Sequence, residues 1–168
     1  MNPLVKIRVT LATCVLRRNR EVREAAESLS IEFMHVTVSE REFQKGWPDL
    51  LTRQVPEWFV IGESPLGVGV VVNAEQERMY VKALSIITDG RKIDWNMLTS
   101  KDRRDVRDTM IFCGHMAYGG QIFVTENKKD FIGHQGSNQK RLELEDLSGT
   151  QIMTVAEFCQ FCSSRHAR

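Results

Sequence analysis

The fold is decided by residues 105–131, which read DVRDTMIFCGHMAYGGQIFVTENKKDF. Two carboxylates open this stretch, and apolar residues at helical spacing follow them. A Gly-Gly pair then ends the predicted helix, and an Ile-Phe-Val run has the composition of a buried parallel strand. Polar residues come directly after that strand. The layout gathers oxygen atoms at one edge of a parallel sheet, where α/β folds bind ligands and where hard cations find the oxygens they prefer.

Short apolar strands alternate with amphipathic helices along the rest of the sequence. Ser39 is expected to cap a short helix, with Glu42 three residues on, and Thr99 to Asp102 form a second capping box. We expect strands at 5–11, 31–38, 121–125 and 150–154, helices at 17–30, 99–118 and 155–163, helix or strand at 74–87, and a loop at 133–140. This alternation predicts a three-layer α/β/α sandwich with a central, mostly parallel sheet, in a single domain spanning 1–168.

Composition narrows the class of protein. The chain has 168 residues, 42% of them hydrophobic and 27% charged, as in an ordinary globular domain. The formal net charge is +1, so any site for a polyanion must be local. No apolar run approaches the roughly 18 residues that a membrane helix needs, and the first residues do not read as a signal peptide. We therefore expect a cytoplasmic protein with no membrane partner.

Three segments resemble the PIN domain, the metal-dependent nuclease fold of VapC-type toxins and of many RNA-processing proteins. Residues 7–16, IRVTLATCVL, are similar to the family's opening strand, which ends in Asp-Thr-Asn-Val-Leu. Residues 38–43, VSEREF, resemble its helix start with one inward glutamate, and residues 105–131 are similar to its third, most specific segment. Residues 153–158 also resemble the family's last strand-to-helix step. Residues 47–99 match no part of the family.

The resemblance implies a set of acidic residues around one or two Mg²⁺ or Mn²⁺ ions, which activate water for phosphodiester hydrolysis. Glu42 takes the second acidic position, with Glu40 as the alternative. Asp108 takes the helix position, and Asp105 lies one turn earlier on the same face. Asn127 stands where many members have a fourth acid, and its side-chain oxygen can ligate a metal or orient a water without supplying charge.

Ala12 departs from the family's pattern, because it stands where the first aspartate is expected. Either the change from aspartate was engineered, or the chain is a naturally degenerate PIN domain. The expected function is a metal-dependent endonuclease, more often a ribonuclease, which this chain's alanine inactivates. The alternative is a non-catalytic PIN-like module that binds nucleic acid or a protein.

The resemblance also bears on partners. It implies RNA more than DNA as the nucleic acid, and it leaves open an antitoxin or another protein partner and a homodimer.

Simpler interpretations accompany several of the motifs. Asp105 and Asp108 could be helix N-terminal carboxylates, and Cys159 and Cys162 are expected to pack in the core rather than bind zinc. An unrelated small-molecule enzyme of Rossmann type is disfavoured, because no Gly-x-Gly-x-x-Gly follows the first strand.

Overall fold

Five strands in the part of the chain that the structure describes form one parallel sheet. A computed structural model describes residues 6–42, 52–58, 60, 64, 69–133 and 137–166, without the side chains of Arg41, Glu42 and His166. The strand order is β3-β2-β1-β4-β5, and every neighbouring pair is parallel. The strands are β1 (Ile7–Leu11), β2 (Ile31–Val36), β3 (Arg53–Val55), β4 (Ile122–Val124) and β5 (Gln151–Met153).

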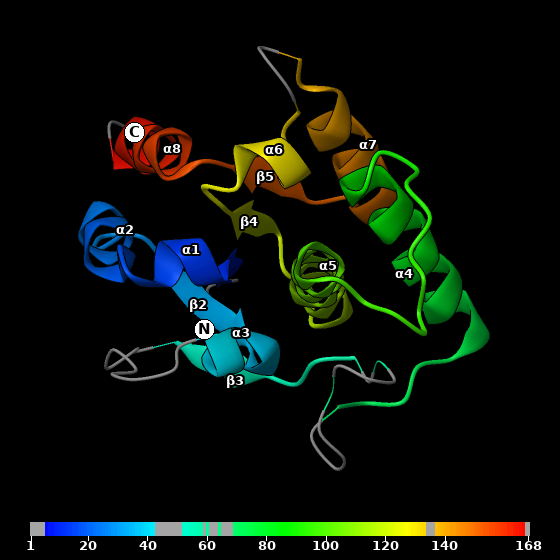
Figure 1. The fold of residues 1–168 in the computed structure, drawn as a ribbon. Helices are drawn as coiled ribbons and strands as arrows, with labels where there is room; N and C mark the ends of the chain where they lie inside the picture. The colour runs from blue at the N-terminus through cyan, green and yellow to red at the C-terminus, as the bar shows by residue number, and fades with distance from the viewer. Residues whose placement is uncertain are drawn as a thin grey trace.

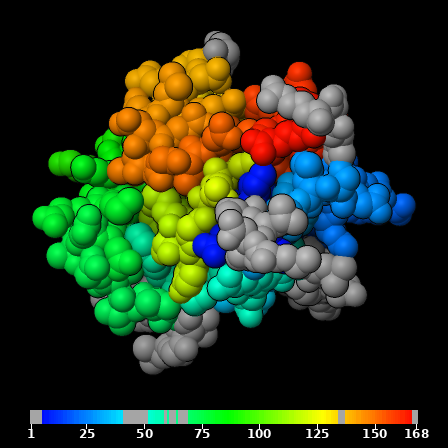
Figure 2. All heavy atoms as spheres, turned by 180° about the vertical axis from the view of Figure 1, so that it is seen from behind, coloured from blue at the N-terminus to red at the C-terminus, as the bar shows by residue number. Residues whose placement is uncertain are grey.

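Helices cover both faces of this sheet, which confirms the predicted three-layer sandwich. Figure 1 shows α1, α2 and α8 on one side and α4, α5 and α7 on the other. Seen from behind, α2 lies beside α8 (Figure 2). The helices among the described residues are α1 (Thr13–Leu16), α2 (Asn19–Ala25), α3 (Thr37–Glu42), α4 (Ala74–Ile87), α5 (Ser100–Ala117), α6 (Lys128–Phe131), α7 (Gln139–Ser148) and α8 (Val155–His166).

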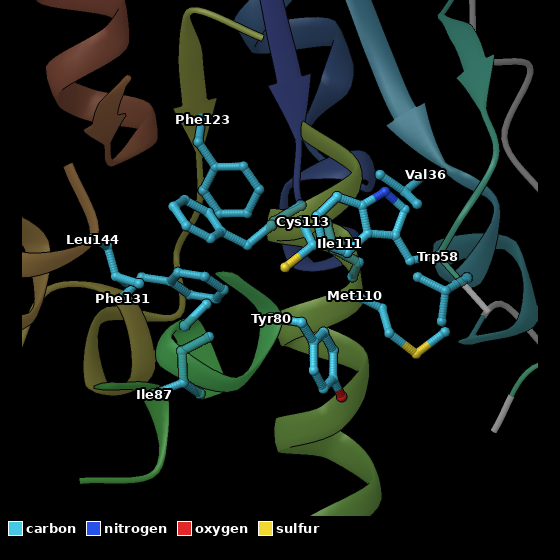
Figure 3. Packing of buried hydrophobic residues seen from close by; sticks show 14 of the residues in the cluster. Val36, Trp58, Tyr80, Ile87, Met110, Ile111, Cys113, Phe123, Phe131 and Leu144 are labelled. Atoms are coloured by element: carbon cyan, nitrogen blue, oxygen red, sulfur yellow. The ribbon is translucent and has the colours of Figure 1, made fainter. Parts of the chain in front are cut away.

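Two apolar clusters, one on each face of the sheet, hold the layers together. In the larger cluster the Phe112 ring of α5 meets the Phe123 ring of β4 edge-on, with centroids 5.4 Å apart. The Phe131 ring of α6 lies 5.0 Å from that of Phe123. Figure 3 shows Phe123, Phe131 and Leu144 near one another, so β4, α6 and α7 share this core. Burial of such large side chains supplies the main driving force for folding.

The long helix α5 agrees closely with its prediction. Thr99 is its N-cap and forms a capping box with Asp102, and the helix ends at Ala117. Gly119 then adopts a left-handed conformation with φ of 69°, which a glycine accepts without strain. The capped start and the glycine end fix α5 between the loop before it and β4 after it.

Several other elements differ from expectation. The second strand ends at Val36, and α3 begins at Thr37, so Ser39 lies inside the helix, fully buried, and does not cap it. The first long helix is shorter than predicted and covers Asn19–Ala25. Residues 74–87 form a helix, and the end of the expected 133–140 loop belongs to α7.

The strand order contains a topological switch point between β1 and β4. The chain winds outward from β1 through β2 to β3, then returns to β4 on the other side of β1 and continues to β5. At such a point the loops after the two central strands diverge to opposite faces and leave a crevice at the carboxyl edge of the sheet. Ala12 follows β1 and Thr125 follows β4 at this edge.

In the part of the chain that the structure describes, no helix is both long enough and apolar enough to cross a bilayer.

Candidate functional site

A pocket of about 550 Å³ lies at the switch point. Its walls come from three parts of the chain: the turn after β1, the first half of α5, and the turn and short helix after β4. The lining residues are Ala12, Thr13, Cys14, Arg17, Lys101, Arg104, Asp105, Asp108, Asn127, Lys129 and Asp130. The fold therefore places a polar, charged pocket where parallel α/β sheets bind ligands.

Backbone pairing fixes the two loops of the pocket relative to each other. The Ala12 amide donates to the carbonyl oxygen of Val124 at 3.0 Å, which extends the pairing of β1 with β4 by one residue. The Thr125 amide donates to the carbonyl oxygen of Met153 at 2.9 Å. On α5 the lining residues recur three and four positions apart, so they form one stripe on the helix surface. Rigid elements thus position each wall.

An amide group joins two carboxylates at the floor of the pocket. Asn127 Nδ2 donates to Asp108 Oδ2 at 2.9 Å and to Asp130 Oδ2 at 2.8 Å. Its Oδ1 accepts the Asp130 backbone N–H at 3.4 Å, and its own backbone N–H donates to Thr125 Oγ1 at 3.1 Å. The side chain of Asn127 therefore caps α6 and relieves the repulsion between two acids that would otherwise face each other.

Asp105 is engaged from outside the pocket. Arg91 Nη2 donates to Asp105 Oδ2 at 2.6 Å, and Nη1 of the same guanidinium pairs with Asp102. Both carboxylates are buried. Hydrogen bonds from Thr99 and from the Arg91 guanidinium lower the pKa of Asp102 to about 2. The charge of Asp105 is thus already compensated by a protein cation.

Basic side chains surround the mouth of the pocket. Lys101, Arg104 and Lys129 are exposed. Among the described residues, these three form no ion pair. Arg17 lines the same mouth. Beside the polar pocket, Lys101, Arg104 and Lys129 are a local attraction for an anion, although the whole chain is close to neutral.

The turn at Ala12 leaves some of its hydrogen-bonding groups without partners. Ala12 is the N-cap of α1 and is 4% exposed, and no side chain caps the helix. The Thr13 hydroxyl is buried without a hydrogen-bond partner. Aspartate, asparagine and serine normally accept the first helical N–H groups at an N-cap, and alanine cannot. The position where the sequence lacks an expected aspartate is therefore also one where the backbone lacks a cap.

Four predicted site residues meet in this pocket: Ala12, Asp105, Asp108 and Asn127. Glu42 is the last residue of α3, but its side chain lies outside the described part of the structure. Its alternative, Glu40, accepts hydrogen bonds from Gln54 at 2.7 Å and pairs with His35 at 2.9 Å, and it does not line the pocket. These positions leave the functional roles as predictions.

The cysteine pair near the C-terminus packs as expected. Cys162 is fully buried in the smaller apolar cluster, and Cys159 packs against that cluster. Burial raises the pKa of Cys162 to about 11 and raises that of Cys159 as well, so both remain thiols at neutral pH. Zinc binding requires thiolates, which this environment disfavours.

Asp130 is the pocket carboxylate that was not predicted from the sequence as a site residue. It is 9% exposed, lies in α6 and shares the Asn127 amide with Asp108. A usable signal was its spacing: a residue three positions after an N-cap asparagine turns back toward that cap. The short helix that brings it there was not predicted from the sequence.

Divalent cations need more ligands than this floor supplies. Among the described residues, no group of three His, Cys, Asp or Glu side chains could hold a metal ion. The Asn127 NH₂ group, and not its oxygen, faces Asp108 and Asp130. Alanine contributes no ligand at position 12, and Asp105 is paired with Arg91. The described residues, as they stand, do not fit Mg²⁺ or Mn²⁺.

No protein-family model matches the chain, and no curated protein matches it. What the pocket can do therefore follows from its own chemistry.

Proposed function

We propose that this chain binds nucleic acid, RNA in preference to DNA, on a frame that resembles a PIN-type endonuclease, and that it holds the phosphodiester backbone without cutting it. The observation that carries the proposal is the composition of one pocket at the switch point. Cations ring its mouth, and an uncharged alanine occupies the position that would complete an acidic cluster at its floor.

Phosphate is the anion that best suits this mouth. Lys101 and Arg104 lie in the first half of α5, and Lys129 lies across the pocket on α6. Cations on two walls can contact successive phosphates of one strand, and each contact releases counterions from the nucleic acid. The partly charged helix N-terminus of α5 adds to the same potential. Binding should therefore be strongly dependent on salt.

A salt titration of binding tests this function. Affinity for a labelled single-stranded RNA should fall steeply as salt rises, and Lys101→Ala or Arg104→Ala should each lower the slope of log K against log salt by about 1. Lys82→Ala is the matched control, because Lys82 is an exposed cation on α4 away from the pocket. Absence of binding at low salt, or an equal loss in the Lys82 variant, would reject the proposal.

A second candidate is the metal-dependent endonuclease itself, with alanine at position 12 as its defect. The specific observation in its favour is that Ala12 shares one pocket with Asp105, Asp108 and Asp130, so a carboxylate at position 12 would be a fourth acid there. Such a cluster repels itself unless a divalent cation relieves it. This candidate predicts that the charge, and not the size, of the new side chain matters.

Three variants separate the two candidates. Ala12→Asp should cleave labelled RNA or DNA in Mg²⁺ or Mn²⁺ and stop when a chelator is added. Ala12→Asn has nearly the same shape without the charge and should not cleave, and Asp108→Asn added to Ala12→Asp should abolish cleavage. If Ala12→Asp binds RNA and leaves it intact under all these conditions, only the binding function remains.

A further inference from the structure

The segment that leads into α5 presents an aromatic ring to solvent. Trp95 is 49% exposed, and Met97, two residues later, is 76% exposed. Trp58, by contrast, is 4% exposed and belongs to the larger core cluster. An exposed tryptophan leaves a large apolar area in water, so the residues around Trp95 indicate whether its ring can bind a ligand.

The Trp95 segment is held in place from several sides. A turn at its centre is closed by the Met97 amide donating to the carbonyl oxygen of Asp94 at 3.1 Å. Before the turn, Ile93 packs against the core, and Arg91 binds the buried carboxylates of α5. After it, the Thr99 capping box fixes the start of the helix. Trp95 is therefore displayed on a fixed support.

This support leads directly into the helix that carries two cations of the pocket mouth. Trp95 precedes the N-cap Thr99 by four residues, so their Cα atoms are at most about 14 Å apart. Lys101 and Arg104, which line the pocket, follow in the first turns of the same helix. At about 3.4 Å per stacked nucleotide, a strand of about four nucleotides covers this upper limit.

We infer that Trp95 is a stacking platform for an unpaired base of a single-stranded nucleic acid whose backbone lies on Lys101 and Arg104. The inference rests on the proposed function and names its substrate class. A ring beside a basic groove is how proteins hold single strands without reading their sequence, because every base offers a flat face. Bases of a duplex are already stacked and paired and cannot use such a platform. The occupant is therefore a single strand.

Three substitutions of Trp95 test the platform by fluorescence anisotropy with one labelled oligonucleotide, single-stranded and as a duplex. Trp95→Ala should weaken single-strand binding about 5- to 100-fold. Trp95→Phe should keep most of the affinity, and Trp95→Leu, which is apolar without an aromatic face, should lose it. All three should leave the salt slope unchanged, whereas Lys101→Ala lowers it by about 1. Their thermal midpoints should match the parent's, since the ring is half exposed.

The outcomes separate this inference from the function beneath it. If the parent binds and Lys101→Ala weakens it while Trp95→Ala stays within about twofold, the platform is wrong and the phosphate site stands. The same result is expected if Trp95 instead contacts a protein. Equal losses for Trp95→Leu and Trp95→Phe, or equal losses for single strand and duplex, also overturn it. No binding by the parent rejects the proposed function and the platform together.

Discussion

The side chain at position 12 has two separate roles in the structure. As the N-cap of α1 it should offer an acceptor to the helix, and as a wall of the pocket it sets the charge beside Asp108. Alanine meets neither demand. Its methyl group does keep the pocket floor at two carboxylates, which the Asn127 amide suffices to hold together. The residue therefore suits a pocket that attracts an anion better than one that holds a cation.

Replacing Ala12 should separate capping from charge in the stability of the protein. Ala12→Asn should raise the free energy of unfolding by about 1 kcal/mol, because its side chain accepts a helical N–H. Ala12→Asp should gain less in chelator, since its charge faces Asp108, and should recover the difference in Mg²⁺. Urea unfolding with and without Mg²⁺ measures both effects.

The control for capping is Ala12→Val, which adds bulk without an acceptor and should not stabilise the chain. An Asn variant less stable than the parent would show that the pocket wall, and not the missing cap, governs this position. Equal responses of the Asp and Asn variants to Mg²⁺ would contradict the role given to charge.

Much of the pocket could be predicted from single residues, because its loops directly follow strands of the sheet. Ala12 and Asn127 come just after β1 and β4, and register at a parallel sheet edge brings such positions together. Two features were out of reach. The use of Asp105 by Arg91 depends on a loop whose path the sequence does not specify, and the NH₂ orientation of Asn127 depends on both acids being present.

At the scale of elements, the contact between α5 and β2 shows how closely helix and sheet approach. A Cβ added at Gly114 would lie 2.8 Å from Val36 Cγ2 and 2.9 Å from its Cγ1. Val36 is fully buried and β-branched, so its side chain has little freedom to move aside. Glycine at this position allows α5 to sit against the sheet.

Gly114→Ala should therefore destabilise the protein by about 1–2 kcal/mol, although alanine is the better helix former by about 1 kcal/mol, because overpacking outweighs propensity. Adding Val36→Ala removes the obstructing methyl groups. In a double-mutant cycle by urea unfolding, Gly114→Ala should cost less in the Val36→Ala background than in the parent. Strictly additive effects would contradict the steric cause.

Elements with a strong pattern were predicted well, and those without one were not. The capping box and apolar stripe of α5 located it nearly to the residue. The strand β3 has the sequence RQV, in which only the valine favours a strand, and its pairing with β2 stabilises it. In α7 the sequence QKRLELEDLS has Leu144 fully buried but Leu142 exposed, which weakens the apolar periodicity. Tertiary packing decides such elements.

At the scale of the whole molecule, a buried histidine links stability to pH. His115 lies in the core between α5 and the sheet, fully buried, with Nδ1 2.9 Å from Thr10 Oγ1. Burial lowers its pKa to about 3, from 6.5 in an exposed side chain. Between about pH 3 and pH 6.5, the unfolded chain therefore binds a proton at this histidine, and the folded protein does not.

The stability that this histidine governs should be complete above about pH 6.5 and be lost as the pH falls from 6.5 toward 3. Because one pKa unit corresponds to about 1.4 kcal/mol, the loss is on the order of 4 kcal/mol. His115→Gln keeps a hydrogen-bonding group and cannot titrate, so its unfolding free energy should fall less over the same range. Urea unfolding at several pH values gives the comparison. Parallel pH profiles for parent and variant would contradict the assignment.

The pairing of β1 with β4 also has a consequence for how the protein is made. Val9 lies opposite Ile122 and Leu11 opposite Val124, with most of the chain between the partners. Contacts between such distant segments form slowly, because closing the long loop costs entropy before the contacts can stabilise the fold. On the ribosome, the turn after β1 emerges early and waits for β4. A nascent chain thus has no complete pocket until synthesis has passed Asp130.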